Sequence, residues 1–228
     1  MWKHLLRLLA QNSCCACGTE LTIQERCVCM NCLSQIPSTG FDRNFSENEL
    51  YYRFAGKVPI AGAYSHFFFE KKGRMQKIMQ QLKYGASPQI GLFLGKLIAA
   101  RLQDSDFVEK LQVIVPVPLH NKRQITRGYN QSERIATGIG RSLGVTIDTN
   151  RIRRKKHTST QTAMSRDERW ENVKDAFEVV KPMNHHILLV DDVITTGATL
   201  EACIRSLLSA SPAPASIRIA SVGIARKM

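Results

Sequence analysis

Two adjacent carboxylates and the turn after them form the stretch of this sequence best suited to chemistry. Asp191 and Asp192 follow the apolar run Ile187–Val190, which predicts a short buried strand that the two acids close. A turn of small and hydroxyl residues comes next and opens an amphipathic helix from Ala198. Where a strand leads into a helix through such a turn, backbone N–H groups and the positive end of the helix dipole point at one place. Anions such as phosphate bind there.

The residue types in this turn suit a ligand that is more than a simple anion. Gly197 lets the backbone approach a ligand closely, and the hydroxyls of Thr195, Thr196 and Thr199 can donate hydrogen bonds. Two carboxylates beside such a turn would repel a plain anion, so the ligand should also carry a diol or a divalent cation. A phosphorylated ribose offers both. The alternative is a buried strand that ends in a solvated Asp-Asp turn and binds nothing.

The stretch Val190–Thr199 resembles the signature with which type I phosphoribosyltransferases bind phosphoribosyl pyrophosphate (PRPP). In that family two acids contact the ribose 2′- and 3′-hydroxyls, and the following loop holds the 5′-phosphate. The 6-oxopurine salvage enzymes carry a catalytic acid where this chain has Thr195, so that class is disfavoured. The resemblance implies that PRPP binds with Mg²⁺, and it assigns PRPP contacts to Asp191, Asp192, Thr195, Thr196, Gly197, Ala198 and Thr199.

A second candidate region begins with the buried strand that Val113–His120 predicts. Two prolines interrupt this run, and because proline cannot donate to a strand ladder, the strand must end there and enter a rigid loop. A loop at the carboxyl end of a strand lies where α/β folds bind ligands. Lys122, Arg123 and Arg127 follow at once, and Arg127–Glu133 opens a helix that continues to about Leu143. Taken alone, these basic residues could equally belong to a solvated turn.

The stretch Val115–Glu133 closely resembles the ComF family, competence proteins that are related to phosphoribosyltransferases. A second pattern of that family matches at Lys155, Thr158, Gln161, Arg166, Arg169, Asn172, Ala176 and Phe177. The resemblance implies that the loop residues Pro118, Leu119 and His120 contact PRPP together with Arg123. It further implies catalytic roles, including neutralisation of the departing pyrophosphate, for a set of two acids and two basic residues: Asp191, Asp192, Lys155 and Arg127.

The segment 151–169 contains a stretch that is too polar to be core. It combines basic, hydroxyl and amide side chains: Arg151, Arg153, Arg154, Lys155, Lys156, Thr158, Ser159, Thr160 and Gln161. We expect a mobile loop that folds over a polyphosphate, because phosphoribosyltransferases close such a loop over pyrophosphate and exclude water. A surface loop without a role is the alternative.

Cysteines mark a separate N-terminal module. Six of the seven cysteines fall between residues 14 and 32. The set contains two CxxC pairs eleven residues apart, a spacing that can place four thiolates tetrahedrally around one structural Zn²⁺. Disulfides are the competing explanation and fit a cytoplasmic protein poorly. The predicted metal ligands are Cys14, Cys17, Cys29 and Cys32, and either Cys15 or Cys27 could replace one of them.

The remaining segments predict the elements that position these residues. Val58–Phe69 predicts one or two strands, and Arg74–Tyr84 and Ile90–Leu102 carry apolar residues at helical spacing. Strands are also expected at Phe177–Val180 and Ser216–Ala225. Alternating strands and helices of this length imply an α/β fold with a mostly parallel sheet flanked by helices. The resemblance specifies this as the type I phosphoribosyltransferase fold.

Length and charge limit the class of protein. The 228 residues suffice for one α/β domain with a small appendage. We expect an N-terminal helix and zinc-finger module over 1–36, a polar, irregular linker over 37–57 and the phosphoribosyltransferase-like domain over 58–228. A net charge of +13 favours polyanionic partners, although enzymes that bind phosphate are often basic anyway. No apolar run approaches the roughly 20 residues of a membrane span, and Met1–Ala10 is too short for a signal peptide, so a cytoplasmic protein is expected.

Three functions are compatible with these features. The favoured one, because the resemblance covers nearly the full length, is a ComF-type competence protein that uses PRPP while it handles incoming single-stranded DNA. An active phosphoribosyltransferase with an unknown acceptor is the second. The third is an adaptor without catalysis that joins a DNA helicase through the zinc module. Aromatic residues make up 7% of the chain and none lies in the basic cluster 151–156, so contact with DNA would be electrostatic.

Overall fold

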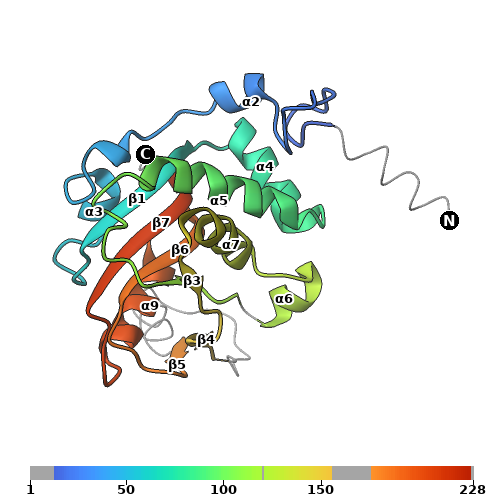
Figure 1. The fold of residues 1–228 in the computed structure, drawn as a ribbon. Helices are drawn as coiled ribbons and strands as arrows, with labels where there is room; N and C mark the ends of the chain where they lie inside the picture. The colour runs from blue at the N-terminus through green and yellow to red at the C-terminus, as the bar shows by residue number, and fades with distance from the viewer. Residues whose placement is uncertain (1–12, 120, 156–175, 227–228) are drawn as a thin grey trace.

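Five parallel strands form the central sheet of the protein. The computed structural model describes residues 13–119, 121–155 and 176–226, with the backbone alone for 121–123. The strand order is β1-β7-β6-β2-β3, and every neighbouring pair is parallel (Figure 1). The strands are β1 (Gly62–Phe69), β2 (Val113–Pro116), β3 (Thr146–Ile147), β6 (His186–Ile194) and β7 (Ser216–Ala225). The predicted α/β class with a mostly parallel sheet is therefore confirmed.

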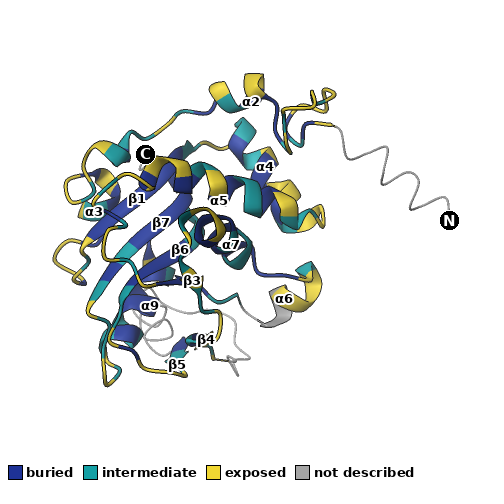
Figure 2. Cartoon of the chain, viewed as in Figure 1, coloured by how far each residue is buried: buried dark blue, intermediate teal, exposed yellow. Residues whose placement is uncertain are grey.

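The centre of this sheet is covered on both faces. Ile187–Val190 in β6 are 0% exposed, as is Ile219 beside them in β7. In Figure 2 both strands are mostly dark blue, the colour of buried residues. A parallel strand buried on both sides is apolar at successive positions instead of alternating. This is why the run before the acid pair could be recognised as a strand from its composition.

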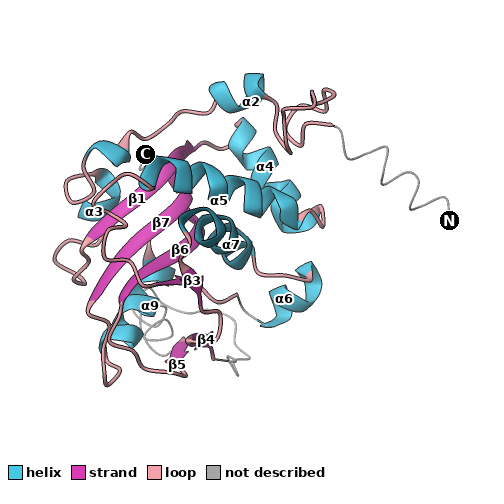
Figure 3. Ribbon diagram, in the orientation of Figure 1, coloured by secondary structure: helices cyan, strands magenta, loops and turns pink. Residues whose placement is uncertain are grey.

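Helices cover both faces because the crossover connections run in opposite directions along the sheet. From β2 the chain passes through α7 (Gln131–Leu143) to β3, and from β6 it passes through α9 (Ala198–Leu208) to β7 on the other side. Crossovers between parallel strands are right-handed, so the two helices lie on opposite faces of the sheet (Figure 3). The direction of winding changes between β6 and β2, and such a switch point is where open α/β sheets bind ligands.

Two further helices complete the face that carries α7. The predicted helices appear as α4 (Arg74–Tyr84) and α5 (Pro88–Leu102). Helix α5 packs closely on α7, because a Cβ at Gly95 would come within 2.2 Å of the carbonyl oxygen of Ile135. Within the described ranges, no helix is both long enough and apolar enough to cross a bilayer.

The segment 37–57 differs from the polar, irregular linker that its composition predicts. It contains the short helices η2 (Phe41–Arg43) and α3 (Glu49–Tyr52). Its apolar side chains Phe41, Leu50 and Phe54 are buried in the core of the α/β domain. The isolated apolar residues of this segment therefore anchor it to the domain, an effect that a local average of polarity does not detect. The domain boundaries themselves stay a prediction.

Three local expectations also need correction. Strand β6 continues through the acid pair to Ile194, because its ladder with β7 extends that far. The chain after β2 contains the helix α6 (Asn121–Arg127) where a loop was expected. Part of the basic cluster is strand β4 (Ile152–Arg154), which pairs antiparallel with β5 (Phe177–Val179) in a separate two-stranded sheet. The rest of the predicted mobile loop and the predicted helix at 1–10 lie outside the described residues.

Candidate functional site

The acid pair and the proline loop meet at the switch point of the sheet. Strand β2 pairs with β6 so that Pro116 lies opposite Val190, and the N–H of Val117 donates to the carbonyl oxygen of Val190 (2.9 Å). The loop that contains Pro118 and Leu119 therefore begins next to Asp191. The side-chain amide of Asn130 donates to the carbonyl oxygen of Val117 (2.9 Å) and fixes this loop to the start of α7.

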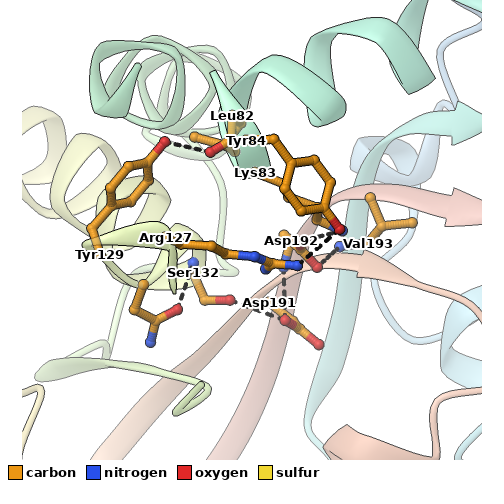
Figure 4. A network of polar contacts seen from close by, with 10 residues as sticks. Leu82, Lys83, Tyr84, Arg127, Tyr129, Ser132, Asp191, Asp192 and Val193 are labelled. Atoms are coloured by element: carbon orange, nitrogen blue, oxygen red, sulfur yellow. Dashed lines mark hydrogen bonds and ion pairs between the residues drawn. The ribbon is translucent and has the colours of Figure 1, made fainter. Parts of the chain in front are cut away.

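Side chains from two helices hold the acid pair in place (Figure 4). The hydroxyl of Ser132 at the start of α7 donates to Asp191 Oδ1 (3.0 Å), which also accepts from the N–H of Asp192 (2.8 Å). The ammonium group of Lys83, near the end of α4, forms an ion pair with Asp192 Oδ2 at 2.8 Å. Asp192 Oδ1 accepts from the N–H of Val193 (2.6 Å). Both carboxylates are thus oriented and only partly exposed.

The surroundings reduce the negative charge of the pair. Burial, and after it the neighbouring carboxylate of Asp192, raise the pKa of Asp191 to about 7. The carboxyl of Asp191 is therefore ionised less readily than a carboxyl in water. Lys83 balances the charge of Asp192. A phosphate beside the pair is therefore repelled less than it would be by two fully ionised and unpaired carboxylates.

The turn after β6 leads directly into α9. Gly197 adopts a left-handed conformation (φ 86°) at the N-cap position, and the helix has no side-chain cap there. The N–H of Ala198 makes a long contact of 3.4 Å with the hydroxyl of Thr196. Thr195 and Thr196 are exposed. An uncapped helix N-terminus with exposed hydroxyls beside it is an arrangement that can bind a phosphate group.

Two residues from the segment 37–57 support this turn, and sequence reasoning missed both. The buried guanidinium of Arg53 donates to the carbonyl oxygen of Thr195, to that of Ala225 at the end of β7 and to the carboxylate of Glu49. Phe54 packs beneath Gly197, where a Cβ would come within 3.0 Å of its ring. Apart from the pair with Glu49, these contacts join residues more than 140 positions apart, and no local pattern in the sequence indicates them.

An aromatic and basic group lies next to the acid pair. The guanidinium of Arg127 is 5.1 Å from the ring centre of Tyr84, and one of its nitrogens is 3.4 Å from the Tyr84 hydroxyl. Figure 4 shows this side chain reaching across from the end of α6 to the end of α4. The hydroxyl of Tyr129 donates to the carbonyl oxygen of Leu82, which ties the start of α7 to α4. Arg127 was predicted to be a catalytic residue. Its contact with Tyr84 brings it close to Lys83.

The other predicted basic residues are not brought to the acid pair by the described contacts. Lys155 follows β4, and its backbone N–H donates to the carbonyl oxygen of Ala176 (2.8 Å). His120 and the side chain of Arg123 lie outside the described residues. Their roles toward pyrophosphate stay predictions. Ser132 could have been found, because it stands inside the stretch Val115–Glu133 that carries the ComF resemblance.

The predicted cysteines form a compact cluster in the N-terminal module, residues 13–36. The Sγ atoms of Cys14, Cys17, Cys29 and Cys32 all lie within 4.8 Å of one another. A tetrahedral zinc ion with Zn–S bonds of about 2.3 Å needs sulfur atoms about 3.8 Å apart, so the donor set fits this metal.

Backbone donors surround these sulfur atoms. The N–H of Cys29 donates to Cys14 Sγ (3.3 Å) and the N–H of Cys32 to Cys29 Sγ (3.4 Å). Such contacts stabilise thiolates, the form that binds metal. Cys15 and Cys27 are not members of the cluster.

A carboxylate pair followed by an uncapped helix, at the switch point of a doubly wound parallel sheet, defines a protein of the phosphoribosyltransferase type. Comparison with known families agrees, because residues 126–227 match the phosphoribosyl transferase domain. This match covers α7, the acid pair and the turn into α9.

Relatives extend the comparison beyond that domain. Competence protein F of Haemophilus influenzae is 32% identical over 82% of this chain and 74% of its own length. DNA utilization protein YhgH of Escherichia coli K12 is 32% identical over 59% of this chain and 61% of its own. Competence protein ComFC of Bacillus subtilis is 35% identical over 45% of this chain and 40% of its own. The chain therefore belongs to the ComF family of competence proteins.

Proposed function

We propose that this protein binds PRPP at the carboxyl end of β6. The observation that carries the proposal is the oriented acid pair beside an uncapped helix N-terminus. Asp191 and Asp192 accept hydrogen bonds from the ribose hydroxyls, while Thr195–Thr199 bind the 5′-phosphate with backbone N–H groups and hydroxyls. Mg²⁺ accompanies PRPP, as carboxylate and phosphate oxygens suit that cation.

The same site could transfer the phosphoribosyl group. Loss of pyrophosphate leaves positive charge at C1′ of the ribose, so catalysis means stabilising the leaving group and orienting an acceptor. Arg127 lies near the acid pair and can neutralise pyrophosphate, together with Arg123, Lys155 and the Pro118–His120 loop. The acceptor is the part of this chemistry for which the chain offers no recognisable residue.

For the biological role we propose the handling of internalised single-stranded DNA in the cytoplasm during transformation, with PRPP as substrate or regulator. The relatives are named competence and DNA utilization proteins, which supports this role. The net charge of +13 supports contact with a polyanion. The cysteine cluster is proposed to hold a structural Zn²⁺, and the module around it is a candidate contact for a competence DNA helicase.

Calorimetric titration with PRPP and Mg²⁺ tests the ligand. The double substitution Asp191→Asn/Asp192→Asn keeps the shape of the side chains but replaces both carboxyl groups by weaker amide acceptors, so PRPP affinity should fall about tenfold. Reduced repulsion of the pyrophosphate keeps the expected loss from being larger. The matched control Asp104→Asn/Asp106→Asn changes the charge equally on two exposed residues away from the site and should bind like the wild type. Equal affinity of all three proteins would contradict the proposed site.

Binding of single-stranded DNA is tested by the salt dependence of affinity. If basic side chains contact phosphates, the logarithm of the association constant falls linearly with the logarithm of salt concentration, with a slope of about −0.7 for each phosphate neutralised. Fluorescence anisotropy with a labelled oligonucleotide, measured between about 50 and 200 mM salt, gives this slope. A slope near zero would exclude electrostatic contact with DNA.

A further inference from the structure

Helix α4 is anchored at its first residue to the cysteine cluster. The guanidinium of Arg74 donates through Nη1 to Cys32 Sγ (3.0 Å) and through Nε to Gln35 Oε1 (2.8 Å). Both acceptors belong to the N-terminal module, and Arg74 belongs to the α/β domain. In Figure 1 the start of α4 lies on the side of the domain that faces this module.

The last turn of the same helix is anchored to the acid pair and its neighbours. Lys83 forms the ion pair with Asp192, Tyr84 contacts Arg127, and the carbonyl oxygen of Leu82 accepts from Tyr129. Between the two ends the apolar face of α4 is buried at Met75, Ile78, Met79 and Leu82. Lys83 is nine positions after Arg74, a distance of about 14 Å along a helix. The helix is thus one packed, rigid element with an anchor at each end, the kind of element that can carry coupling between two sites.

Charge explains why the first anchor depends on the state of the cluster. Four thiolates around a divalent metal carry a net charge of −2, and a guanidinium at 3.0 Å from one sulfur is a direct counter-ion for it. Without the metal, nothing holds the four sulfur atoms together, and Cys32 Sγ is no longer fixed beside α4. Arg74 then loses the fixed acceptor that holds it.

We propose that Arg74 is a positioning residue that couples metal occupancy of the cysteine cluster to the acid pair through α4. With the cluster filled, Arg74 fixes the start of α4, and the helix in turn fixes Lys83 against Asp192. Without the metal, Arg74 releases the helix and Lys83 is held less firmly. This coupling extends the proposed function, because the acid pair is also the proposed PRPP site. A firmly held acid pair should bind PRPP more tightly, so metal binding should raise PRPP affinity. Linkage then requires that PRPP raise metal affinity by the same factor.

Hydrogen exchange measured on the full chain without PRPP tests the anchor. Stripping the metal should speed amide exchange at Met79–Tyr84 at least about threefold, and Arg74→Gln should do the same with the metal still bound. Lys77→Gln, which removes one positive charge from an exposed position of the same helix, should exchange like the wild type. Arg74→Lys, which keeps the charge but loses the planar fork, should be intermediate. Faster exchange confined to residues 13–36, or an unaffected Arg74→Gln, would overturn the proposal.

A second measurement separates this coupling from PRPP binding itself. In the wild type, saturating PRPP with Mg²⁺ should raise zinc affinity about fivefold, read by competition with a zinc-selective chelator, and Arg74→Gln should abolish the effect. Lys77→Gln should retain it. PRPP binding without any change in zinc affinity would refute the coupling and leave the proposed function standing. A wild type that binds no PRPP would refute the proposed function, and the exchange experiment would still decide the role of Arg74.

Discussion

Replacing Cys29 by serine should lower the metal content from about one zinc ion per chain to well below one. The N-terminal module has few apolar residues of its own, and metal binding supplies about 10 kcal/mol or more to the folding of such modules. Cys29 also accepts a hydrogen bond from the N–H of Cys32 at the start of α2 (Met30–Ser34). Loss of its thiolate should therefore unfold residues 13–36. Elemental analysis and amide exchange of this segment measure the two effects.

The matched control for this substitution is Cys15→Ser. Cys15 lies in the same module and is partly buried, but it is not a member of the four-cysteine cluster. We expect this variant to keep its zinc and the protection of its amide groups. Full zinc content in Cys29→Ser, or equal loss of zinc in both variants, would contradict the assignment of the four ligands.

Replacing Arg53 by methionine should lower the free energy of unfolding by about 2–4 kcal/mol. The side chain of Arg53 is 3% exposed, and its guanidinium joins the carbonyl oxygens of Thr195 and Ala225 to the carboxylate of Glu49. Methionine fills the space of the alkyl chain but leaves both carbonyl oxygens without this donor. The turn that begins at Thr195 should loosen, and PRPP affinity should fall with it.

Urea unfolding measures this loss from the shift of the midpoint at constant slope. Arg43→Met makes the same chemical change at an exposed residue of the segment 37–57 and should alter stability by less than about 0.5 kcal/mol. Arg53→Lys should fall between the two, since an ammonium group cannot reproduce the planar fork. An Arg53→Met protein as stable as Arg43→Met would show that the buried contacts carry no net energy.

The parts of the site that could be predicted from sequence are those whose residues are contiguous in the chain. The acid pair and the turn to Thr199 are contiguous, so strand, turn and helix follow from the order of residue types. The cysteine cluster was predictable for the same reason, because two CxxC pairs at this spacing can bring four thiols together. Helix α4 and strand β2 followed from apolar spacing and from the prolines that end the strand.

The supports of the site could not be predicted, because they depend on contacts between distant residues. Arg53 reaches Thr195 from a segment whose composition is typical of a linker. Apolar spacing predicts the helix that carries Lys83, but only the packing of α4 shows that Lys83 pairs with Asp192. The basic residue Arg153 forms an ion pair with Glu178 across the two-stranded sheet instead of lying in a loop. In each case the tertiary partner, and not the local pattern, decides what the side chain does.

The proposed function requires that the acids and the turn after β6 bind two parts of one sugar phosphate. A crystal structure of the protein with PRPP and Mg²⁺ tests this claim directly. We predict that the ribose hydroxyls lie within hydrogen-bond distance of Asp191 and Asp192, and that the 5′-phosphate accepts from the backbone N–H groups of Thr196–Thr199. A complex in which the phosphate lies away from this turn, or in which both carboxylates stay out of contact with the ribose, would contradict it.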